Sequence, residues 1–304
     1  MKPSHIPVLL SETIQILAPK ASDRMLDLTL GLGGHSEALL NATDGKASLV
    51  AVDTDAENIV MAKKRLEKFD STVSIVHANF ASLPDCLPSE QRTFDLILAD
   101  LGLSSPHIDD SSRGFTFRAD APLDMRFDRS SGMTAAMLLA SLDPESLRKI
   151  FWDYGELSKV RHLVDEIVRR RSDSPVRTST QLVDVATQVF GFKAPAALPQ
   201  IFQALRIAVN RETEVLRRML EAAPLLLAPG GRMAIISYHS LEDRMVKSAF
   251  RLLSADAKDP ITGSPSRVAK FLPITKKAVT PSNEEILGNP RSRSAKLRAI
   301  RRRE

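Results

Sequence analysis

The sequence predicts an α/β protein, in which a parallel sheet with helices on both faces is interrupted by an inserted helical domain. Three observations predict it. Over the first hundred residues or so, short apolar runs alternate with amphipathic segments, the pattern of a parallel sheet with helical crossovers. In residues 103–209 the alternation gives way to a polar loop followed by helices. An apolar strand then resumes, so a single sheet brackets the helical segment.

The first half of the sheet follows in chain order. Helices are expected at His35–Asn41 and Ala56–Lys68, because apolar residues recur there at helical spacing. Continuous apolar runs predict the strands, since strands of a parallel sheet are buried on both faces. These strands are expected at Met25–Leu30, Ser48–Val52, Val73–His77 and Phe94–Ala99.

The inserted segment opens its main helical part at Asp143-Pro144, an N-cap residue followed by proline in the first turn. Trp152 and Tyr154 lie on that helix and are expected in the core of the insert. Further helices are expected at Leu157–Arg171 and Ser179–Phe190, and Ala204–Leu227 leads back to the sheet. The strand Arg232–Ser237 resumes it, and Phe271–Thr275 and Ala295–Ile300 are candidates to complete it. We therefore expect one domain of residues 1–102 plus 210–304 and a second of residues 103–209.

Composition limits the class of protein. Cys86 is the one cysteine of 304 residues, which excludes an intrachain disulfide and a cysteine metal cluster and favours a reducing, cytoplasmic location. The apolar run near the N-terminus is too short for a signal peptide, and Glu12 interrupts it. No apolar stretch approaches the length of a membrane span. Neither a membrane nor a metal is expected.

Positive charge is concentrated at the C-terminus. Residues 267–304 carry eleven Lys and Arg against three Glu, a net charge of +8, whereas the whole chain carries +5. A basic block on a near-neutral body indicates a polyanionic partner, most often nucleic acid. The alternative is a solvated tail. In the expected last strand Lys296, Arg298 and Ile300 share one face, which predicts a basic ridge continuing into a flexible tail.

A glycine turn follows the first strand, in the stretch LDLTLGLGGHS from Leu26 to Ser36. A strand, a glycine turn and a helix N-terminus together commonly form a ligand cradle, although an ordinary tight turn is the alternative. Asp53 ends the second strand twenty residues after Gly33, where nucleotide-binding sheets place the carboxylate that accepts from ribose hydroxyls. Dinucleotides and S-adenosylmethionine both fit. The widened turn and Ser36 favour a ligand without a pyrophosphate.

The segment Asp27-x-Thr29-x-Gly31-x-Gly33-Gly34-His35-Ser36, and further motifs along nearly the whole chain, resemble those of the RsmH (MraW) family. This family comprises S-adenosylmethionine-dependent methyltransferases that act on the N4 amine of a cytidine in the decoding region of 16S ribosomal RNA. The resemblance implies a Rossmann-like class I methyltransferase sheet with helices on both faces. The motifs that carry it are Asp27-x-Thr29-x-Gly31-x-Gly33-Gly34-His35-Ser36, His5-x-Pro7-Val8-Leu9-Leu10-x-Glu12, Asp100 to Pro106, Arg113-Gly114-Phe115, Pro122 to Arg126, Phe202 to Ile207, Ser237 to Arg244 and Asn289 to Arg298.

The resemblance also implies the cofactor site. Gly33, Gly34 and His35 are expected at the methionine end of S-adenosylmethionine, and Asp53 at the ribose. Phe80 is expected against the adenine, with a core phenylalanine as the alternative. Asp100 and His107 are expected to close the pocket near the sulfonium. The chain departs from the family at two places: His107 stands where the family usually has Gln, and Gln200 lies in a stretch where the family tends to carry Arg.

Asp100 is also a catalytic hypothesis on chemical grounds. The exocyclic amine of cytosine is a poor nucleophile because its lone pair is delocalised into the ring. A carboxylate that accepts a hydrogen bond from the amine localises that lone pair and eases proton loss. Asp100 follows the fourth strand, at the edge where open α/β sheets bind ligands. A sulfonium supplies an activated methyl group, so the reaction needs positioning and no metal.

Eight residues are candidates for contacting RNA. The loop at 113–128 combines aromatic and guanidinium groups suited to splayed bases, the alternative being a loop folded over the pocket. His239 and Asp243 follow the fifth strand at the ligand edge, although a lone histidine is more often structural. The candidates are Arg113, Phe115, Arg126, Arg206, His239, Asp243, Arg291 and Arg293.

The sequence is thus interpreted as an enzyme that methylates 16S ribosomal RNA, within the small ribosomal subunit. Two other functions stay open at this point. A dehydrogenase would share the nucleotide-binding sheet, but Ser36 and the basic C-terminus disfavour it. A non-catalytic ribosome assembly factor would keep the fold, but Gly33, Asp53 and Asp100 together disfavour it.

Overall fold

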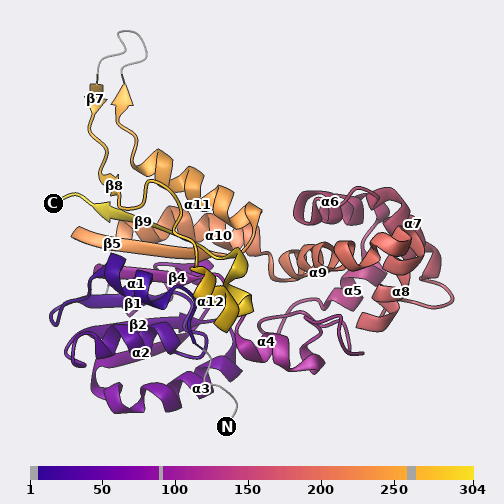
Figure 1. Ribbon diagram of the computed structural model, residues 1–304, viewed down its shortest axis with the longest axis horizontal. Helices are drawn as coiled ribbons and strands as arrows, with labels where there is room; N and C mark the ends of the chain where they lie inside the picture. The colour runs from indigo at the N-terminus through magenta and orange to yellow at the C-terminus, as the bar shows by residue number, and fades with distance from the viewer. Residues whose placement is uncertain (1–5, 89–91, 259–264) are drawn as a thin grey trace. The chain divides into compact units, whose positions relative to one another are not determined.

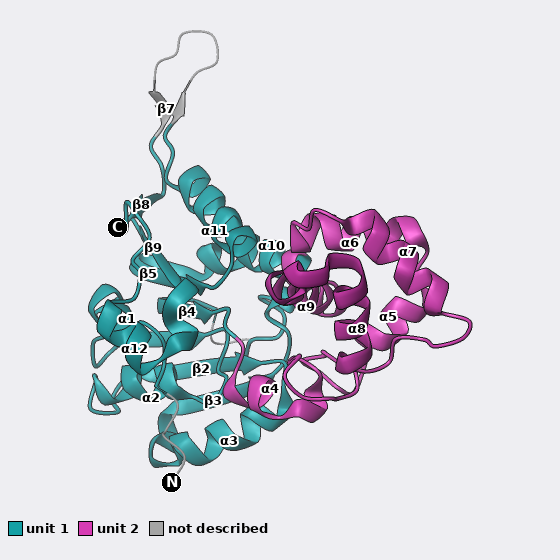
Figure 2. Cartoon of the chain, turned by 45° about the vertical axis from the view of Figure 1, so that its right-hand side comes forward, with its two compact units in different colours: residues 1–102, 214–304 teal, residues 103–213 magenta. Residues whose placement is uncertain are grey.

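The computed structural model describes residues 6–88, 92–258 and 265–304, so His5 of the N-terminal motif lies outside the described residues. The chain divides into two compact units (Figure 2). Unit 1 comprises residues 1–102 and 214–304, and unit 2 comprises residues 103–213. The second boundary thus falls at residue 213, four residues beyond the expected 209.

Unit 1 is built on a seven-stranded sheet in the order β3-β2-β1-β4-β5-β9-β8 (Figure 1). The first five strands of the chain are parallel, and β9 pairs antiparallel with both β5 and β8. The α/β fold class is confirmed as a Rossmann-like sheet. The strands are β1 (Arg24–Asp27), β2 (Ser48–Asp53), β3 (Val73–His77), β4 (Phe94–Asp100), β5 (Leu227–Ser237), β8 (Phe271–Pro273) and β9 (Lys296–Arg302); β6 (Ala257–Lys258) and β7 (Pro265–Arg267) form a separate pair.

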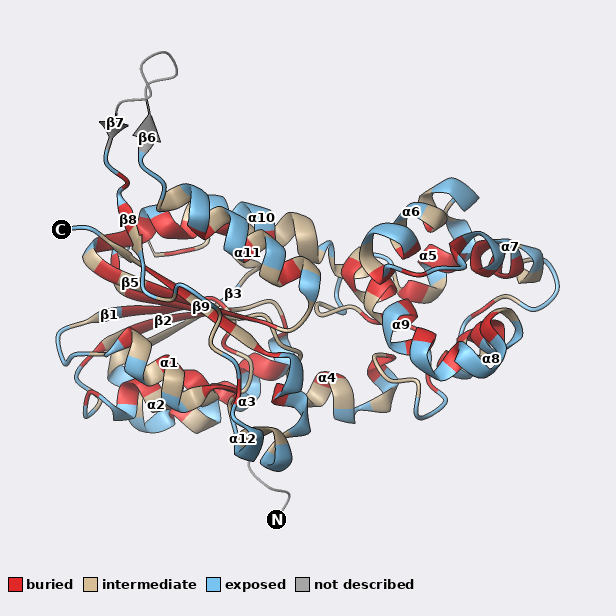
Figure 3. Cartoon of the chain, turned by 45° about the horizontal axis from the view of Figure 1, so that its top comes forward, coloured by how far each residue is buried: buried red, intermediate tan, exposed pale blue. Residues whose placement is uncertain are grey.

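Helices cover both faces of this sheet, as Figure 3 shows for α10 and α11 on one side and α1 to α3 on the other. Successive strand residues explain it: Leu26 enters the core beneath α10 and α11, whereas Met25 enters the core beneath α1 to α3. The helices are α1 (Leu10–Leu17), α2 (Gly34–Asn41), α3 (Ala56–Leu66), α10 (Glu212–Ala222), α11 (Ser240–Leu253) and α12 (Asn283–Gly288), with 3-10 turns η1 (Glu67–Thr72), η2 (Phe80–Ser82), η5 (Ala223–Leu226) and η6 (Pro290–Ser294).

Unit 2 is helical and has its own core. Phe151, Leu163, Leu182 and Leu205 are fully buried in a cluster drawn from residues 123–205 alone. Asp143 caps the expected helix by accepting from the backbone N–H groups of residues 145 and 146. The elements are α4 (Ser105–Asp109), η3 (Ser111–Arg113), α5 (Ala135–Ser141), α6 (Pro144–Gly155), α7 (Val160–Arg170), α8 (Ser179–Phe190), η4 (Gly191–Lys193) and α9 (Ala194–Asn210).

The segment Ala204–Leu227 contains the end of α9, α10 and η5, and Arg211, with φ +52°, separates α9 from α10. Two local expectations were wrong. Trp152 is 66% exposed and does not belong to the core of the insert, whereas Tyr154 packs partly buried against it. The first strand ends at Asp27, three residues earlier than expected, and the backbone N–H of Thr29 donates to the Asp27 carboxylate there.

The expected strand Ala295–Ile300 is present, but Arg301 to Arg303 are not the flexible tail that the sequence predicted after it. Lys296 to Arg302 form β9, which pairs with β5 inside the sheet. Arg302 donates to the backbone oxygen of Leu227, and Arg303 donates from Nε to that of Ala269 at 2.9 Å. The basic block is therefore partly built into the sheet. Among the residues that the structure describes, none of the helices has the length and apolar character needed to cross a bilayer.

Candidate functional site

Three aspartates lie where parallel strands of unit 1 end. Asp27, Asp53 and Asp100 are the last residues of β1, β2 and β4. The register aligns these ends, since Asp27 lies opposite Leu98, two residues before the end of β4. The carboxyl edge of an open α/β sheet is where its ligands bind. The candidate site is therefore this edge.

The turn between β1 and α2 accepts only glycine at two positions. Gly33 has φ +76°, and a Cβ on Gly34 would lie 2.6 Å from Cγ of Pro7. The same turn is tied to the neighbouring strand, because the N–H of Gly31 donates to Oδ2 of Asp53 at 2.6 Å. The backbone is thus held close to the ends of β1 and β2 at the start of α2. Gly33, Gly34 and Asp53, expected at the cofactor, lie together.

Asp27 fixes the base of this turn, and the sequence-based site residues did not include it. Its Oδ2 accepts from the hydroxyl of Ser36 at 2.6 Å, and its Oδ1 accepts from the N–H of Thr29 at 3.0 Å. Burial raises the pKa of Asp27, against the hydrogen bonds from Ser36 and Thr29 that lower it. The motif contained both partners of Asp27, so its spacing was the available signal.

His35 faces Asp100 without a hydrogen bond of its own. Nε2 of His35 lies 3.5 Å from Oδ2 of Asp100, an ion-pair distance at which no hydrogen bond forms here. Both ring nitrogens of His35 are buried and have no hydrogen-bond partner in the described structure. Buried polar groups in native proteins nearly always have partners. Both nitrogens of the imidazole can therefore still form a hydrogen bond to a polar ligand at this edge.

Hydrogen bonds hold Asp100 in place, and its carboxylate remains accessible to solvent. Its N–H donates to the hydroxyl of Thr29 at 2.6 Å, and its Oδ1 accepts from the N–H of Gly102 at 3.2 Å. The Asp100 side chain is 22% exposed. A carboxylate oriented in this way has lone pairs left for a further donor.

Asp53 is a half-buried acceptor. Oδ2 accepts from Gly31, and Oδ1 accepts from the N–H of Asp55 at 2.7 Å. Burial raises the pKa of Asp53 to about 6, despite these two hydrogen bonds. Each oxygen keeps a lone pair, so hydroxyl donors would favour the ionised form.

Phe80 opens the short turn η2 after β3. Asn79 caps this turn by accepting from the N–H of Ala81 at 2.9 Å. The Phe80 ring is half-buried and packs against the core beneath α10 and α11. One side of the Phe80 ring is thus packed in the core, and the rest of the ring is accessible.

Tyr238 follows β5 and was missed, although it stands next to His239 in the sequence. Its ring lies where a side chain on Gly102 would be, 2.8 Å from the position of that Cβ. Burial raises the pKa of Tyr238 well above its ordinary value, and the negative charge of Asp100 and a hydrogen bond with that carboxylate add to the shift. Tyr238 is therefore a neighbour of Asp100.

His239 and Asp243 have partners inside unit 1. His239 caps α11 with Glu242: its Nε2 lies 3.1 Å from Oε1 of Glu242, and its backbone N–H donates to Oε2 at 3.3 Å. Asp243 accepts from Arg298 and Lys296 of β9, at 2.7 and 3.4 Å. These contacts give both residues a role in holding α11.

Five of the predicted site residues lie in unit 2, and four of them, His107, Arg113, Phe115 and Arg126, come from residues 107–126. His107 is buried and stacks with Phe127 and Phe115, at ring-centroid distances of 5.0 and 5.2 Å. The Arg113 side chain is also buried and donates to the backbone oxygens of residues 126 and 127. The guanidinium of Arg126 donates two hydrogen bonds to the carboxylate of Asp124, at 2.7 and 2.9 Å. These contacts build an ordered aromatic loop.

The remaining arginines differ in exposure. In unit 2, Arg206 donates to both carboxylate oxygens of Glu212, at 2.8 and 2.9 Å. In unit 1, Arg291 and Arg293 lie on η6, where both are exposed. Of the eight RNA candidates, these two are the ones on an open surface of the sheet unit.

Comparison with known proteins identifies the family of the chain. The chain matches the model of the MraW methylase family over residues 2–303. A Thermomicrobium roseum protein called Ribosomal RNA small subunit methyltransferase H is 42% identical over 306 residues, covering 98% of this chain and 94% of the relative. A Heliobacterium mobile protein of the same name is 41% identical over 312 residues, covering 98% of each. Among solved structures, NSun6 from Pyrococcus horikoshii with SFG matches at a TM-score of 0.46 and 13% identity, over 99% of this chain and 53% of that one.

Proposed function

The chain belongs to the MraW methylase family, and we propose that it transfers a methyl group from S-adenosylmethionine to the N4 amine of a cytidine. The proposed substrate is the decoding region of 16S ribosomal RNA, within the small ribosomal subunit in the cytoplasm. The relatives are named as methyltransferases of small-subunit ribosomal RNA over almost the same length, which supports the substrate class. The motifs quoted above support the choice of cytidine.

The residues at the ligand edge fit S-adenosylmethionine. The buried, unpartnered nitrogens of His35 suit a polar ligand group, and Gly34 lets the start of α2 pack closely against Pro7 beside it. The carboxylate of Asp53 has lone pairs for ribose hydroxyls, and the half-buried ring of Phe80 suits a purine face. When bound, the sulfonium supplies an activated methyl group. We assign His107, on the family pattern, to the same cofactor.

One observation carries the proposed chemistry: the Asp100 carboxylate lies at the ligand edge, oriented by Gly102 and accessible from solvent. Asp100 accepts a hydrogen bond from the N4 amine and so localises the nitrogen lone pair. The carboxylate then stabilises the positive charge that develops on nitrogen and eases loss of the proton. Positioning the amine against the methyl group contributes the rest.

The RNA is assigned to two surfaces. Unit 2 is proposed as the substrate-recognition domain, with the aromatic loop around Phe115 and Arg126 facing bases. Arg291 and Arg293 are exposed on η6 and suit phosphates. Arg113, Arg206, His239 and Asp243 have internal partners, so we assign them to holding these surfaces in shape.

The function is tested by mapping the product. Purified protein, small ribosomal subunits from cells that lack it and S-adenosylmethionine are incubated together, and the methylated nucleotides are identified by mass. One N4-methylcytidine in the decoding region is expected. A methyl group on another base would contradict the cytidine assignment, and no transfer would favour an assembly factor. Calorimetry with S-adenosylmethionine and NAD as ligands separates a methyltransferase from a dehydrogenase.

The catalytic assignment needs its own variant. Asp100→Asn keeps the size of the side chain and removes the negative charge, so turnover should fall by at least about a hundred-fold at saturating cofactor. Asp44→Asn is the matched control, because Asp44 lies before β2, at the other end of the sheet, and is exposed. Near-normal turnover of Asp100→Asn would remove the carboxylate from the mechanism.

A further inference from the structure

An aromatic side chain stands almost fully in solvent on unit 2. Phe192, in the turn η4 between α8 and α9, is 90% exposed, more than any other large apolar residue among those described. Gly191 makes this turn possible, because its φ of +58° and ψ of −130° lie in a region that is essentially open to glycine alone. No atom lies within 4 Å of a Cβ built on Gly191. Its backbone conformation, not crowding, therefore requires glycine there.

Positive charge accompanies this ring. The ammonium of Lys193 lies 5.7 Å from the centre of the Phe192 ring, within cation–π range. Lys159, the N-cap residue of α7, donates to the backbone oxygen of Val189 at 3.0 Å and lies 6.0 Å from the ring of Phe190. Lys159 keeps two further donors. Both lysines thus lie at the C-terminal end of α8.

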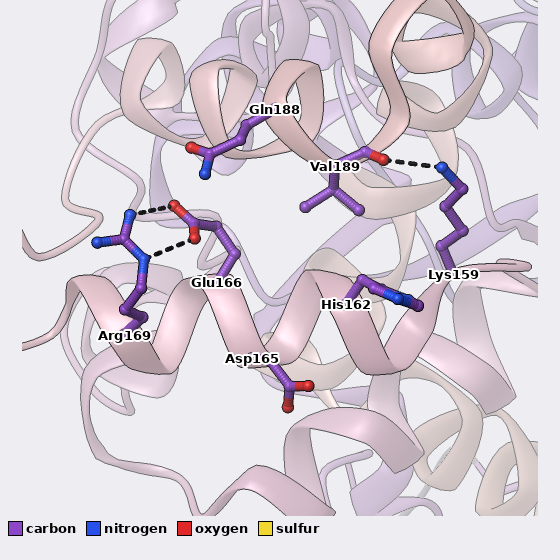
Figure 4. Close-up of a pocket in the computed structure, with 7 residues that line it drawn as sticks. All are labelled: Lys159, His162, Asp165, Glu166, Arg169, Gln188 and Val189. Carbon is purple, nitrogen blue, oxygen red and sulfur yellow. Dashed lines mark hydrogen bonds and ion pairs between the residues drawn. The ribbon is translucent and has the colours of Figure 1, made fainter.

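A hollow of about 360 Å³ lies beside the turn, between α7 and α8 (Figure 4). Val189 of this lining is three residues before Phe192, a span of at most about 11 Å. We call it the α7–α8 hollow, and it is lined by Lys159, His162, Asp165, Glu166, Arg169, Gln188 and Val189.

The lining of the hollow carries two positive and two negative side chains, and the excess of positive charge comes from Arg170 and Arg148, which pair with its two carboxylates. Glu166 accepts from both Arg169 and Arg170 at 2.7 Å, so one carboxylate faces two guanidinium groups. Asp165 points away from the other labelled side chains in Figure 4 and pairs with Arg148 at 3.1 Å. Lys159 adds a further positive charge. This surface therefore attracts anionic groups.

We propose that Phe192 and the α7–α8 hollow together bind single-stranded RNA, with one base stacked on Phe192 and phosphates held by Lys159, Arg169 and Lys193. An exposed aromatic ring next to a basic groove is the arrangement by which proteins bind single strands. A protein partner fits less well, since one ring among charges is not a broad apolar patch. This inference rests on the proposed function, because it assigns a contact for the same RNA substrate.

The test uses the full chain and a fluorescein-labelled single-stranded oligoribonucleotide of about ten nucleotides. By anisotropy, Phe192→Ala should bind roughly five- to fifty-fold more weakly, which is the usual loss for one stacked base. Phe192→Leu should lose as much, and Phe192→Trp should retain binding, because stacking needs an aromatic face. Lys193→Ser should lower the slope of log K against log salt by about 0.7. Folding should be unaffected at so exposed a position.

Trp152→Ala is the matched control, because Trp152 is another exposed aromatic of unit 2, on α6, and is 66% exposed. It should bind RNA normally, and an equal loss there would overturn the assignment to Phe192. Full RNA affinity of Phe192→Ala, while the unsubstituted protein binds the oligonucleotide and methylates small subunits, overturns this inference alone. An unsubstituted protein that neither binds RNA nor methylates it overturns both proposals. A loss with small subunits and none with the oligonucleotide indicates a protein contact and also overturns the inference.

Discussion

Arg298 donates hydrogen bonds from Nε and Nη2 to the two carboxylate oxygens of Asp243, at 2.7 and 3.2 Å. Lys296 reaches the same carboxylate at 3.4 Å. The bonds join β9 to α11, and the Asp243 and Arg298 side chains are each only 13% exposed. Lys296 and Arg298, two of the basic residues that the sequence suggested for RNA binding, therefore stabilise the fold.

Asp243→Ala should lower the free energy of unfolding by about 1.5–3 kcal/mol, the contribution of hydrogen bonds to a charged group. Arg298, whose side chain is 13% exposed, and the more exposed Lys296 both lose this acceptor, so the loss is structural. Urea unfolding measures it. The control is Asp256→Ala, an exposed aspartate beyond α11 whose carboxylate accepts from one backbone N–H. Unchanged stability together with weaker RNA binding would instead assign Asp243 to the substrate.

The same pair predicts a loss of stability in acid. Burial alone would raise the pKa of Asp243, but the hydrogen bond from Arg298 and the charges of Arg298 and Lys296 outweigh it, and the pKa lies below the ordinary value. A carboxyl group with a lowered folded-state pKa stabilises the fold above its unfolded value of about 3.9. That stability is lost as the pH falls through the folded pKa. Asp243→Ala should therefore flatten the acid limb of the stability profile.

Most of the sheet was predictable, because the residues of each parallel strand alternate between two buried faces and read as continuous apolar runs. Leu26 and Met25 illustrate this, since they enter opposite cores. The C-terminal strand was harder. Residues 301–303 were expected as a flexible tail after the strand Ala295–Ile300, and only the pairing of β9 with β5 shows that the strand continues to Arg302.

The site was predictable where spacing along the chain brings residues to one edge. Gly33, Asp53 and Asp100 each follow a strand, so the alternation alone groups them. It failed where a side chain pairs with a residue of another element. Glu212 of α10 accepts from Arg206 of α9, and Arg298 of β9 donates to Asp243 of α11, and no pattern in the sequence indicates either pair. Trp152 was misplaced because an aromatic on a helix does not reveal which face is buried.

Asp53→Ala should weaken S-adenosylmethionine binding by about 1.5–3 kcal/mol, the size of a hydrogen bond to a charged group. The pH dependence follows from the pKa of about 6 that burial gives this group. The ionised form accepts from hydroxyls, so affinity should rise as the pH increases through about 6. Calorimetry across that range measures it. A pH profile that the substitution leaves unchanged would place the ribose elsewhere.

Tyr238→Phe should lower turnover by roughly two- to ten-fold and leave cofactor affinity unchanged. The hydroxyl bonds to Asp100 and helps to orient it, and one neutral hydrogen bond contributes about 1 kcal/mol. Steady-state kinetics with small subunits separates turnover from KM. Tyr154→Phe, in unit 2, is the control and should behave as the unsubstituted protein. A larger effect on cofactor binding than on turnover would show that Tyr238 contacts the cofactor instead.

Deleting residues 103–213 and joining Gly102 to Glu214 through a short Gly-Ser linker should leave unit 1 folded and able to bind S-adenosylmethionine partly, with no methylation. The reason is that the buried clusters of the two units share no residue. Thermal unfolding and calorimetry check it. Complete unfolding of the shortened chain would mean that unit 1 depends on the insert for its stability.

The last prediction separates the two parts of the basic C-terminus. Arg291 and Arg293 are exposed on η6, whereas Arg302 and Arg303 donate to backbone oxygens of unit 1. Replacing Arg291 and Arg293 by Ser should weaken binding of all RNA sequences alike and lower the salt slope by about 0.7 per lost phosphate contact. Replacing Arg301, Arg302 and Arg303 by Ser should chiefly lower the melting temperature, because the edge of β9 loses its ties to residues 227 and 269. Anisotropy titrations at several salt concentrations, with a melting curve for each variant, distinguish the two. If the triple variant keeps its melting temperature and loses the salt slope, phosphates are bound by the end of β9 and not by η6.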